Sequence, residues 1–245
     1  MTPADLEILA YEDTELGVLC LRRRELLSAP GEIVTEITLD GEFLMSSRHT
    51  ASEEALARIA LDMHPDSELG VFVGGLGLGY TAHAALASSR VVSVEVVEFL
   101  PQVIDWLESD LVPLSEPLKR DRRFRAVRGD AYARLAGPPS ERFDLILIDV
   151  DHSPDERLGE ADDAFYTEEG LWRARRHLAP GGVLGVWSYA ESSPFSRALE
   201  TVFGDVRVEP VSYYNDLVDE AHTDWLFFAT NRTGKGRESQ WASMI

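Results

Sequence analysis

The first 48 residues carry strand-length runs of apolar side chains. These runs are rich in Val, Ile and Leu, and such β-branched and aliphatic side chains suit a strand. Asp40-Gly41 lies between two of the runs, and Asp-Gly is a dipeptide that favours a two-residue hairpin turn. The pattern predicts a small antiparallel sheet, with strands over 6–11, 17–26, 32–39 and 42–45.

A helical pattern begins at Ser52, and from Leu69 onward short apolar runs alternate with helical stretches. Strands that alternate with helices indicate βαβ units, so we expect a parallel sheet that is covered on both faces. Pro180-Gly181-Gly182 is expected to end a helix before the fifth strand. The apolar runs are GVFVGG, VVSVEVV, FRAVRG, FDLILID and GVLGVWSY, and the helical stretches are TAHAALASS, LPQVIDWLESDLV, AYARLA, TEEGLWRARRHLA and PFSRALETVF.

The end of the chain has a different pattern. Two strand-like runs, VRVEPVSYY and TDWLFFAT, have no helical stretch between them, and they predict an antiparallel pair at one edge of the sheet. The expected fold is α/β, with a doubly wound, mostly parallel, seven-stranded sheet that ends in an antiparallel strand. A small N-terminal antiparallel β appendage completes it. We expect a β-hairpin domain over 1–50, a Rossmann-like domain over 51–232 and a loose tail over 233–245.

Charge and cysteine content narrow the possible partners. The chain has 245 residues and a formal net charge of −20, from 43 Asp and Glu against 23 Lys and Arg. Nucleic acid is not expected as a partner, because phosphate binding needs clustered Lys and Arg, whereas an acidic field attracts cations. Cys20 is the single cysteine, and neither a signal-peptide pattern nor an apolar run of ~20 residues is visible. We expect a cytoplasmic protein that binds neither nucleic acid nor membrane.

A glycine-rich loop, GGLGLG at 74–79, follows the first strand of the alternating part and opens a helix. Glycines at this place let the backbone turn sharply and approach a ligand closely. Glu95 is taken as the end of the second strand, where a carboxylate accepts hydrogen bonds from ribose hydroxyls. The loop fits two ligand classes, a dinucleotide such as NAD and S-adenosylmethionine or a relative of it. A dehydrogenase of this type usually has a further substrate domain, which we do not expect within these 245 residues, and this favours the adenosyl sulfonium.

Two further strands also end in acidic side chains. Asp130 with Ala131 follows FRAVR, and Asp149 follows FDLILI. Open α/β sheets bind ligands at the carboxyl ends of their strands, so we expect Asp130 to accept the adenine amino group and Asp149 to accept or relay a proton. Asp151 and His152 stand just beyond and are expected to bind an acceptor. No second histidine has ligand spacing, so no metal is expected.

Taken together, these motifs resemble the spermidine synthase family, the polyamine aminopropyltransferases, from about residue 7 to residue 231. The likeness lies in the hairpin LDG, the loop VGGLGLG, the segment VEVVEFLPQVI, GDA at 129–131, FDLILIDVDHSP and AFYTEEGLWRARRHLAPGGVL. The resemblance implies a methyltransferase-type sheet and a homodimer. It also implies S-adenosylmethionine or decarboxylated S-adenosylmethionine as the donor, with S-adenosylhomocysteine or methylthioadenosine as the product.

The resemblance also implies roles for single residues. Asp149 matches the position of the family's catalytic aspartate. Donor binding is implied for the residues in the nucleoside-side motifs, which are Gly74, Gly75, Gly77, Glu95, Val96, Asp130, Ala131 and Asp149. Acceptor binding is implied for Glu54, Asp151, His152 and Trp225.

Several positions depart from the family's pattern, mainly in the acceptor half. The aspartate inside the family's glycine loop falls on Gly77, and the Tyr-His of its Tyr-His-Glu motif falls on Ser52-Glu53. The late TYPxGxW motif becomes EAHTDW, which keeps only Trp225. We therefore expect aminopropyl transfer to a cationic or amine small molecule, and we expect putrescine to be a poor acceptor. Methyl transfer to a small molecule and a non-catalytic nucleoside-binding or scaffold protein remain open alternatives.

Overall fold

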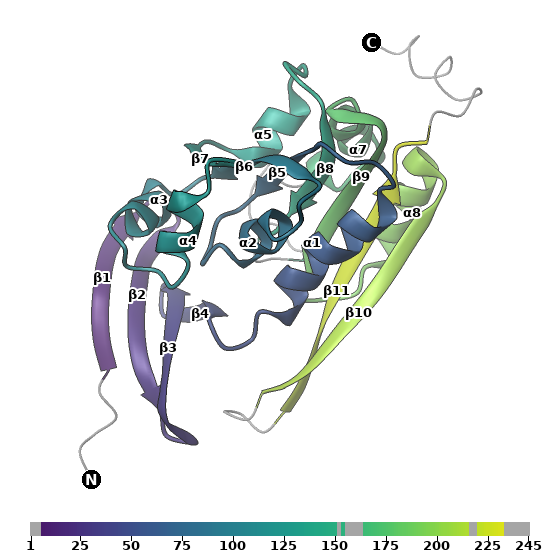
Figure 1. Ribbon diagram of the computed structural model, residues 1–245. Coiled ribbons are helices and arrows are strands. Elements are labelled where there is room, and N and C mark those ends of the chain that lie inside the picture. The colour runs from purple at the N-terminus through teal and green to yellow at the C-terminus, as the bar shows by residue number, and fades with distance from the viewer. Residues whose placement is uncertain (1–5, 151–152, 155–163, 216–219, 233–245) are drawn as a thin grey trace.

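Two sheets form the framework of the molecule (Figure 1). The computed structural model describes residues 6–150, 153–154, 164–215 and 220–232, so the expected tail over 233–245 lies outside the described residues. Asp40 and Gly41 join two strands of the smaller sheet with φ angles of 51° and 83°, the left-handed values that a type I′ turn requires. The expected N-terminal antiparallel sheet is confirmed. Its order is β1-β2-β3-β4, formed by β1 (Leu6–Thr14), β2 (Gly17–Leu26), β3 (Ala29–Leu39) and β4 (Glu42–Ser46).

The larger sheet has seven strands in the order β10-β11-β9-β8-β5-β6-β7. The five strands from β9 to β7 in this order run parallel, and β11 is antiparallel to both β9 and β10. The mostly parallel sheet with an antiparallel pair at one edge is therefore confirmed. Its strands are β5 (Leu69–Gly74), β6 (Val91–Glu98), β7 (Phe124–Arg128), β8 (Phe143–Ile148), β9 (Leu178–Ser188), β10 (Val206–Asn215) and β11 (Glu220–Thr230).

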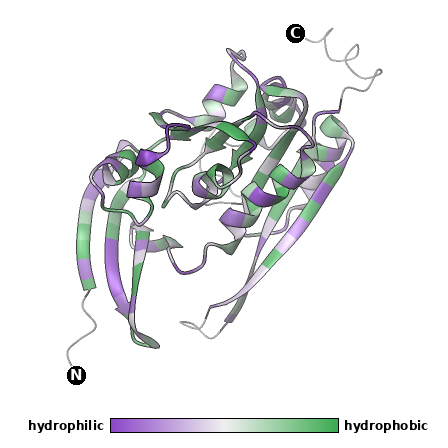
Figure 2. Cartoon of the chain, viewed as in Figure 1, coloured by the Kyte–Doolittle hydropathy of each residue, from purple (hydrophilic) through white to green (hydrophobic). Residues whose placement is uncertain are grey.

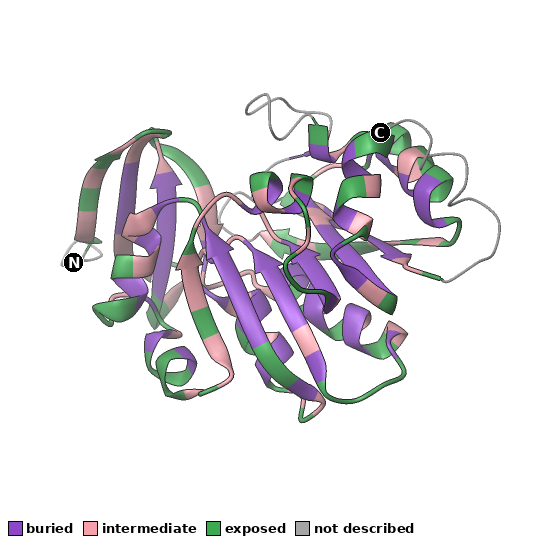
Figure 3. Ribbon diagram, turned by 90° about the horizontal axis from the view of Figure 1, so that it is seen from above, coloured by how far each residue is buried: buried purple, intermediate pink, exposed green. Residues whose placement is uncertain are grey.

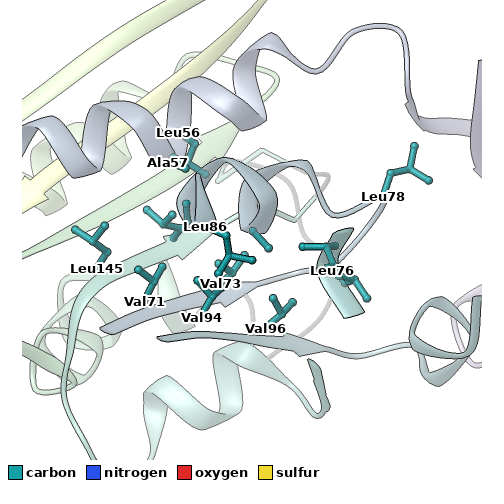
Figure 4. Close-up of a cluster of buried hydrophobic side chains, with 14 of the residues drawn as sticks. Leu56, Ala57, Val71, Val73, Leu76, Leu78, Leu86, Val94, Val96 and Leu145 are labelled. Atoms are coloured by element: carbon teal, nitrogen blue, oxygen red, sulfur yellow. The ribbon is translucent and has the colours of Figure 1, made fainter. Parts of the chain in front are cut away.

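Helices cover both faces of the larger sheet, and each face has its own cluster of buried apolar side chains. The central strands of this sheet are buried (Figure 3), and they are coloured largely green, for apolar residues, in Figure 2. Figure 4 shows part of the first cluster, where Leu56 and Leu86 lie over Val73. The first face carries α1 (Ala51–Met63), α2 (Tyr80–Leu86), α3 (Pro101–Glu108) and α4 (Ser115–Arg120), and the second carries α5 (Ala131–Ala136), α7 (Glu168–Arg175) and α8 (Ser193–Phe203).

The smaller sheet is joined to the larger one through α3 and the glycine-rich loop. Leu19, Leu21 and Ile37 belong to the same apolar cluster as the residues of α1 to α4. Trp106 Nε1 of α3 donates a hydrogen bond to Glu12 Oε1 of β1 at 2.9 Å. The appended sheet therefore borders the carboxyl ends of the parallel strands instead of standing apart from them.

The structure differs from the sequence expectation at two helix ends. The helix expected over 100–112 ends at Glu108, and the separate helix α4 follows it. The helix expected over 167–179 ends at Arg175, and β9 begins before Pro180-Gly181. These two residues form a bulge within the strand, because Gly181 N donates to Asn231 O at 2.8 Å while the register with β8 shifts. None of the helices among the described residues has the length and apolar character to cross a membrane.

Candidate active site

Backbone hydrogen bonds bring the carboxyl ends of four parallel strands to one edge of the sheet. Gly75 N donates to Val97 O at 2.9 Å, and Asp149 N donates to Gly74 O at 2.8 Å. Gly129 N donates to Glu98 O at 2.9 Å on the far side of β6. Ligands of open α/β sheets bind at this kind of edge, so the glycine-rich loop and the acidic residues beside it form the candidate site.

Three glycines of the glycine-rich loop have positive φ angles, a backbone conformation that other residues adopt only with strain. Gly75, Gly77 and Gly79 have φ angles of 95°, 50° and 90°. A Cβ on Gly75 would overlap the backbone oxygen of Asp149, and one on Gly77 would lie 2.6 Å from Met45 Sδ of β4. The loop is thus packed between the end of β8 and the appended sheet, and glycine is required for both contacts.

Gly75→Ala is expected to lower the free energy of unfolding by about 2 kcal/mol or more, because left-handed strain and a backbone overlap add together. Gly31→Ala is the matched control, since Gly31 also has a φ of 90° but its added Cβ would meet nothing within 4 Å. Urea denaturation measures both variants. Equal losses in the two variants would contradict the close approach of the loop to Asp149.

Glu98 is the carboxylate that ends β6 beside the loop. Its Oε2 accepts a hydrogen bond from Leu76 N, and its Oε1 accepts one from Leu100 N, each at 2.8 Å. Burial raises the pKa of Glu98, and the backbone donors of the loop oppose that rise. Glu98 therefore fixes the loop from the end of β6.

Glu95 and Val96 do not have the places that the sequence suggested. Glu95 lies three residues before the end of β6 and is paired with Arg125 and Arg134. Val96 is fully buried in the apolar cluster under α1 and α2 (Figure 4). The strand continues further than the sequence interpretation allowed, so the acidic residue at its end is Glu98.

Asp130 and Ala131 lie directly after β7 on the same edge. Asp130 Oδ1 caps α5 by accepting a hydrogen bond from Ala133 N at 3.0 Å. Ala131 is buried against the loop, since a Cβ on Gly74 would lie 2.9 Å from its methyl group. The carboxylate of Asp130 thus has a structural role, and its second oxygen has no hydrogen-bond partner within the part of the chain that the structure describes.

Three carboxylates from distant parts of the chain face one another next to the loop. Asp149 follows β8, Glu53 lies in the first turn of α1, and Asp224 lies on β11. Glu53 and Asp224 are each 7% exposed. Ser52 donates to Glu53 Oε2 at 2.9 Å and also lies beside Asp224, while Thr81 Oγ1 donates to Asp149 Oδ2.

Burial and mutual repulsion shift the protonation of this cluster. Burial, with Asp149 next and Asp224 also contributing, raises the pKa of Glu53 to about 8. Burial and the charge of Asp224 raise the pKa of Asp149 to about 6, against the hydrogen bond from Thr81. Burial also raises the pKa of Asp224. Buried carboxylates that lie this close together favour either protonation or a bound cation. Among the described residues, no group of His, Cys, Asp and Glu side chains has the arrangement of a metal site.

Stacked rings form a wall next to the carboxylates. His49, in the segment before α1, stacks on Tyr213 of β10 at 4.8 Å between ring centroids. Tyr213 stacks in turn on His222 of β11 at 5.7 Å. Because His222 is two residues from Asp224 on the same strand, this column of rings and the carboxylates share one face of the sheet.

Two of the acceptor residues expected from sequence, Glu54 and Trp225, do not face the carboxylates. Glu54 is exposed and accepts a hydrogen bond from Thr50 Oγ1 at 3.0 Å. Trp225 packs against the apolar cluster of α5, α7 and α8, on the opposite face from Asp224. Asp151 and His152 lie outside the described residues.

The set of site residues expected from sequence did not include Glu53, Glu98 or Asp224, although signals for two of them exist. Glu53 stands three, four and seven residues before buried positions of α1, so helical spacing places it on the inner stripe. Asp224 alternates with Leu226 and Phe228 on one face of its strand. Their closeness to Asp149, however, could be seen only in the tertiary structure.

A curated relative matches part of the chain. No family model matches the chain. "Polyamine aminopropyltransferase 2" of Streptomyces coelicolor is 32% identical over 154 residues, which are 62% of this chain and 26% of that protein. The matched region thus spans about a quarter of the length of that curated relative.

Solved structures share the fold over nearly the whole chain. Spermidine synthase from Thermotoga maritima has a TM-score of 0.69 at 19% identity and covers 93% of this chain and 73% of its own. A spermidine synthase in complex with the transition state analogue AdoDATO has a TM-score of 0.68 at 18% identity, and the match again covers 93% of this chain and 73% of that one. A probable spermidine synthase from Corynebacterium glutamicum has a TM-score of 0.64 at 18% identity, and the match covers 96% of this chain and 84% of that one. The chain therefore has the spermidine synthase fold, and its resemblance to the spermidine synthase family, the polyamine aminopropyltransferases, is confirmed.

Proposed function

We propose that this chain is a spermidine-synthase-like transferase, which moves an aminopropyl group from decarboxylated S-adenosylmethionine to an amine of low molecular mass. The observation that carries the proposal is the group of three carboxylates, Glu53, Asp149 and Asp224, beside a glycine-rich loop at the strand ends. The fold of the chain and the name of its sequence relative support the same reaction class.

The donor half is proposed from the loop and the strand ends next to it. Glu98 accepts backbone hydrogen bonds on both carboxylate oxygens and so holds the loop, and we assign it to the ribose because it ends β6 at the edge where such sheets bind ligands. Asp130 keeps one carboxylate oxygen for an amino group. When bound, the donor supplies a carbon made electrophilic by its positive sulfur. These residues hold the nucleoside, and Asp149 lies next to them.

The acceptor half is proposed from the carboxylates. An alkylamine with a pKa near ~10 is mostly protonated at neutral pH, so it enters as a cation that carboxylates attract. Asp149 takes one proton from the ammonium, and the amine lone pair then forms the new C–N bond as the C–S bond breaks with its electrons on sulfur. Glu53 and Asp224 hold the positive charge and align the amine, which is most of what such a displacement needs.

The test supplies the purified chain with decarboxylated S-adenosylmethionine and a panel of amines, including putrescine, and follows methylthioadenosine. We expect methylthioadenosine to form only when an amine is present, and putrescine to be a poor acceptor because Ser52-Glu53 and Gly77 replace family residues. No product with any amine, together with no thermal stabilisation by methylthioadenosine, would refute the transferase. Rapid spermidine formation, at about 1 s⁻¹ or more, would show that these departures leave putrescine a good acceptor.

Methyl transfer is the second candidate, and one observation favours it. Gly77 carries no carboxylate, and the thioether of Met45 covers the loop at that position. An aminopropyl ammonium would therefore find no charged partner there. A parallel reaction with intact S-adenosylmethionine, followed by S-adenosylhomocysteine, distinguishes the two transfers.

A further inference from the structure

Thr81 makes the one side-chain hydrogen bond of Asp149 within the described residues. Its Oγ1 donates to Asp149 Oδ2, a contact between residues 68 positions apart. Thr81 is the second residue of α2, directly after the glycine-rich loop, and it is 2% exposed. Water therefore does not replace this hydroxyl easily, and the bond to an ionised carboxylate belongs to the stronger class of hydrogen bonds.

The hydroxyl of Thr81 is held in place from two sides. Gly79 begins α2 with a left-handed backbone, which sets the direction of the first helical turn. The backbone oxygen of Glu53 on α1 lies 3.3 Å from Thr81 Oγ1. A hydroxyl has one proton to donate, and the shorter contact to the charged oxygen of Asp149 takes it in preference to the longer one to the neutral carbonyl of Glu53. The branched side chain also has few rotamers in a helix.

We propose that Thr81 is the positioning residue of Asp149, which occupies Oδ2 so that Oδ1 alone faces the acceptor amine. This inference rests on the proposed transferase for its kinetic consequence, but the hydrogen bond is testable without turnover. Nothing in the motifs that resemble the family pointed to Thr81, since it follows the glycine-rich loop rather than forming part of it.

The electrostatic surroundings explain why such a bond matters. Asp149 faces the carboxylate of Glu53 from α1 and that of Asp224 from β11, and Asp224 is itself near His222. Burial and the negative charge of Asp224 favour a neutral Asp149, whereas the Thr81 hydroxyl opposes them and lowers the pKa of Asp149. Without the hydroxyl, the carboxyl group keeps its proton to higher pH and loses its fixed orientation.

The test compares Thr81→Val, which keeps the shape and removes the hydroxyl, with Thr81→Ser, which keeps the hydroxyl. Carboxyl ¹³C NMR, with Asp149 assigned through Asp149→Asn, reads the titration of Asp149 directly. We expect Thr81→Val to raise the pKa of Asp149 by about one unit, and Thr81→Ser to return it towards the original value. In turnover, Thr81→Val is expected to lower kcat about tenfold or more at neutral pH and to move the acidic limb of the pH profile upward, with the KM for the donor little changed.

Thr201→Val is the matched control, because the Thr201 hydroxyl is exposed on α8 and donates to Arg197 O at 2.9 Å, away from the strand ends. An unchanged Asp149 titration in folded Thr81→Val, or a Thr81→Ser variant as impaired as Thr81→Val, would overturn the inference. Should Thr81→Val fail to fold, Thr81→Ala removes the same hydroxyl without the branched methyl group. Absence of turnover in the parent chain counts against the proposed function, while the NMR titration still decides the role of Thr81.

Discussion

Asp149→Asn is expected to lower turnover by about 10²–10⁴-fold while the chain keeps its fold and most of its affinity for the nucleoside. The amide has nearly the same shape as the carboxylate, but it accepts no proton from the amine. The loop contact is also preserved, because Gly74 O bonds to the backbone N of residue 149 rather than to its side chain. Rates are measured as methylthioadenosine formation on the best acceptor, and nucleoside affinity is measured by thermal shift.

Asp205→Asn is the control for this variant. Asp205 is an exposed carboxylate that pairs with Arg232 at 2.5 Å, in the segment between α8 and β10. Its amide variant is expected to behave like the parent chain, since exposed ion pairs contribute little. Unchanged turnover in Asp149→Asn would exclude Asp149 from proton transfer, and the carboxylate that performs it would then be sought at Glu53.

Glu53→Gln is expected to change the pH dependence of both stability and acceptor binding. The pKa of Glu53 is raised in the folded state from 4.5 to about 8, chiefly by burial and then by Asp149. Between these two values the unfolded chain has lost the proton while the folded chain keeps it, so rising pH lowers the free energy of unfolding. The slope is up to about 1.4 kcal/mol per pH unit for one proton. Gln has no proton to lose, so the variant is expected to gain stability over the parent from pH 5 to pH 8 and to keep that gain above pH 8.

The same proton opposes a cationic acceptor. Binding an ammonium requires Glu53 to ionise, so the affinity of the parent chain for the amine is expected to rise with pH towards about 8. Glu53→Gln is expected to bind the amine weakly and without that pH dependence. Urea denaturation and isothermal titration across pH 5–9 measure both effects. Glu54→Gln is the matched control, because Glu54 is the exposed neighbour of Glu53 on α1. Parallel stability curves for the parent and Glu53→Gln would contradict a buried, protonated Glu53.

The hydrophobic pattern predicted most of the fold because each strand and helix carries its own local signal. Asp40-Gly41 has the left-handed backbone that its residue types favour, and the two apolar runs at the end of the chain pair without a helix between them. The pattern was wrong at Pro180-Gly181, where local residue types predict the end of a helix. Pairing of β9 with Asn231 and with β8 outweighs that signal and makes the two residues a bulge inside a strand.

The candidate site was predicted less completely, since strand ends are set by pairing. β6 pairs with β5 and β7 as far as Val97 and Glu98, so the strand ends at Glu98. Glu95 forms an ion pair with Arg134 of α5, which covers the face of the sheet opposite α1 and α2. The interpretation that placed the strand end at Glu95 followed residue spacing alone. The strand ends three residues later than that interpretation placed it. The carboxylate beside the loop is therefore Glu98, whereas Glu95 belongs to a structural ion pair.

By itself, the sequence determined the α/β class, the antiparallel appendage, the glycine-rich loop and the position of Asp149 after a buried strand, because those features depend on residues that are neighbours along the chain. Only the tertiary structure decided that Glu53, Thr81 and Asp224 meet at Asp149, because they come from a helix start, a second helix and an edge strand. Their interaction is set by packing and electrostatics across the sheet. Contacts of that kind, between residues far apart along the chain, leave no local pattern in the order of the residues.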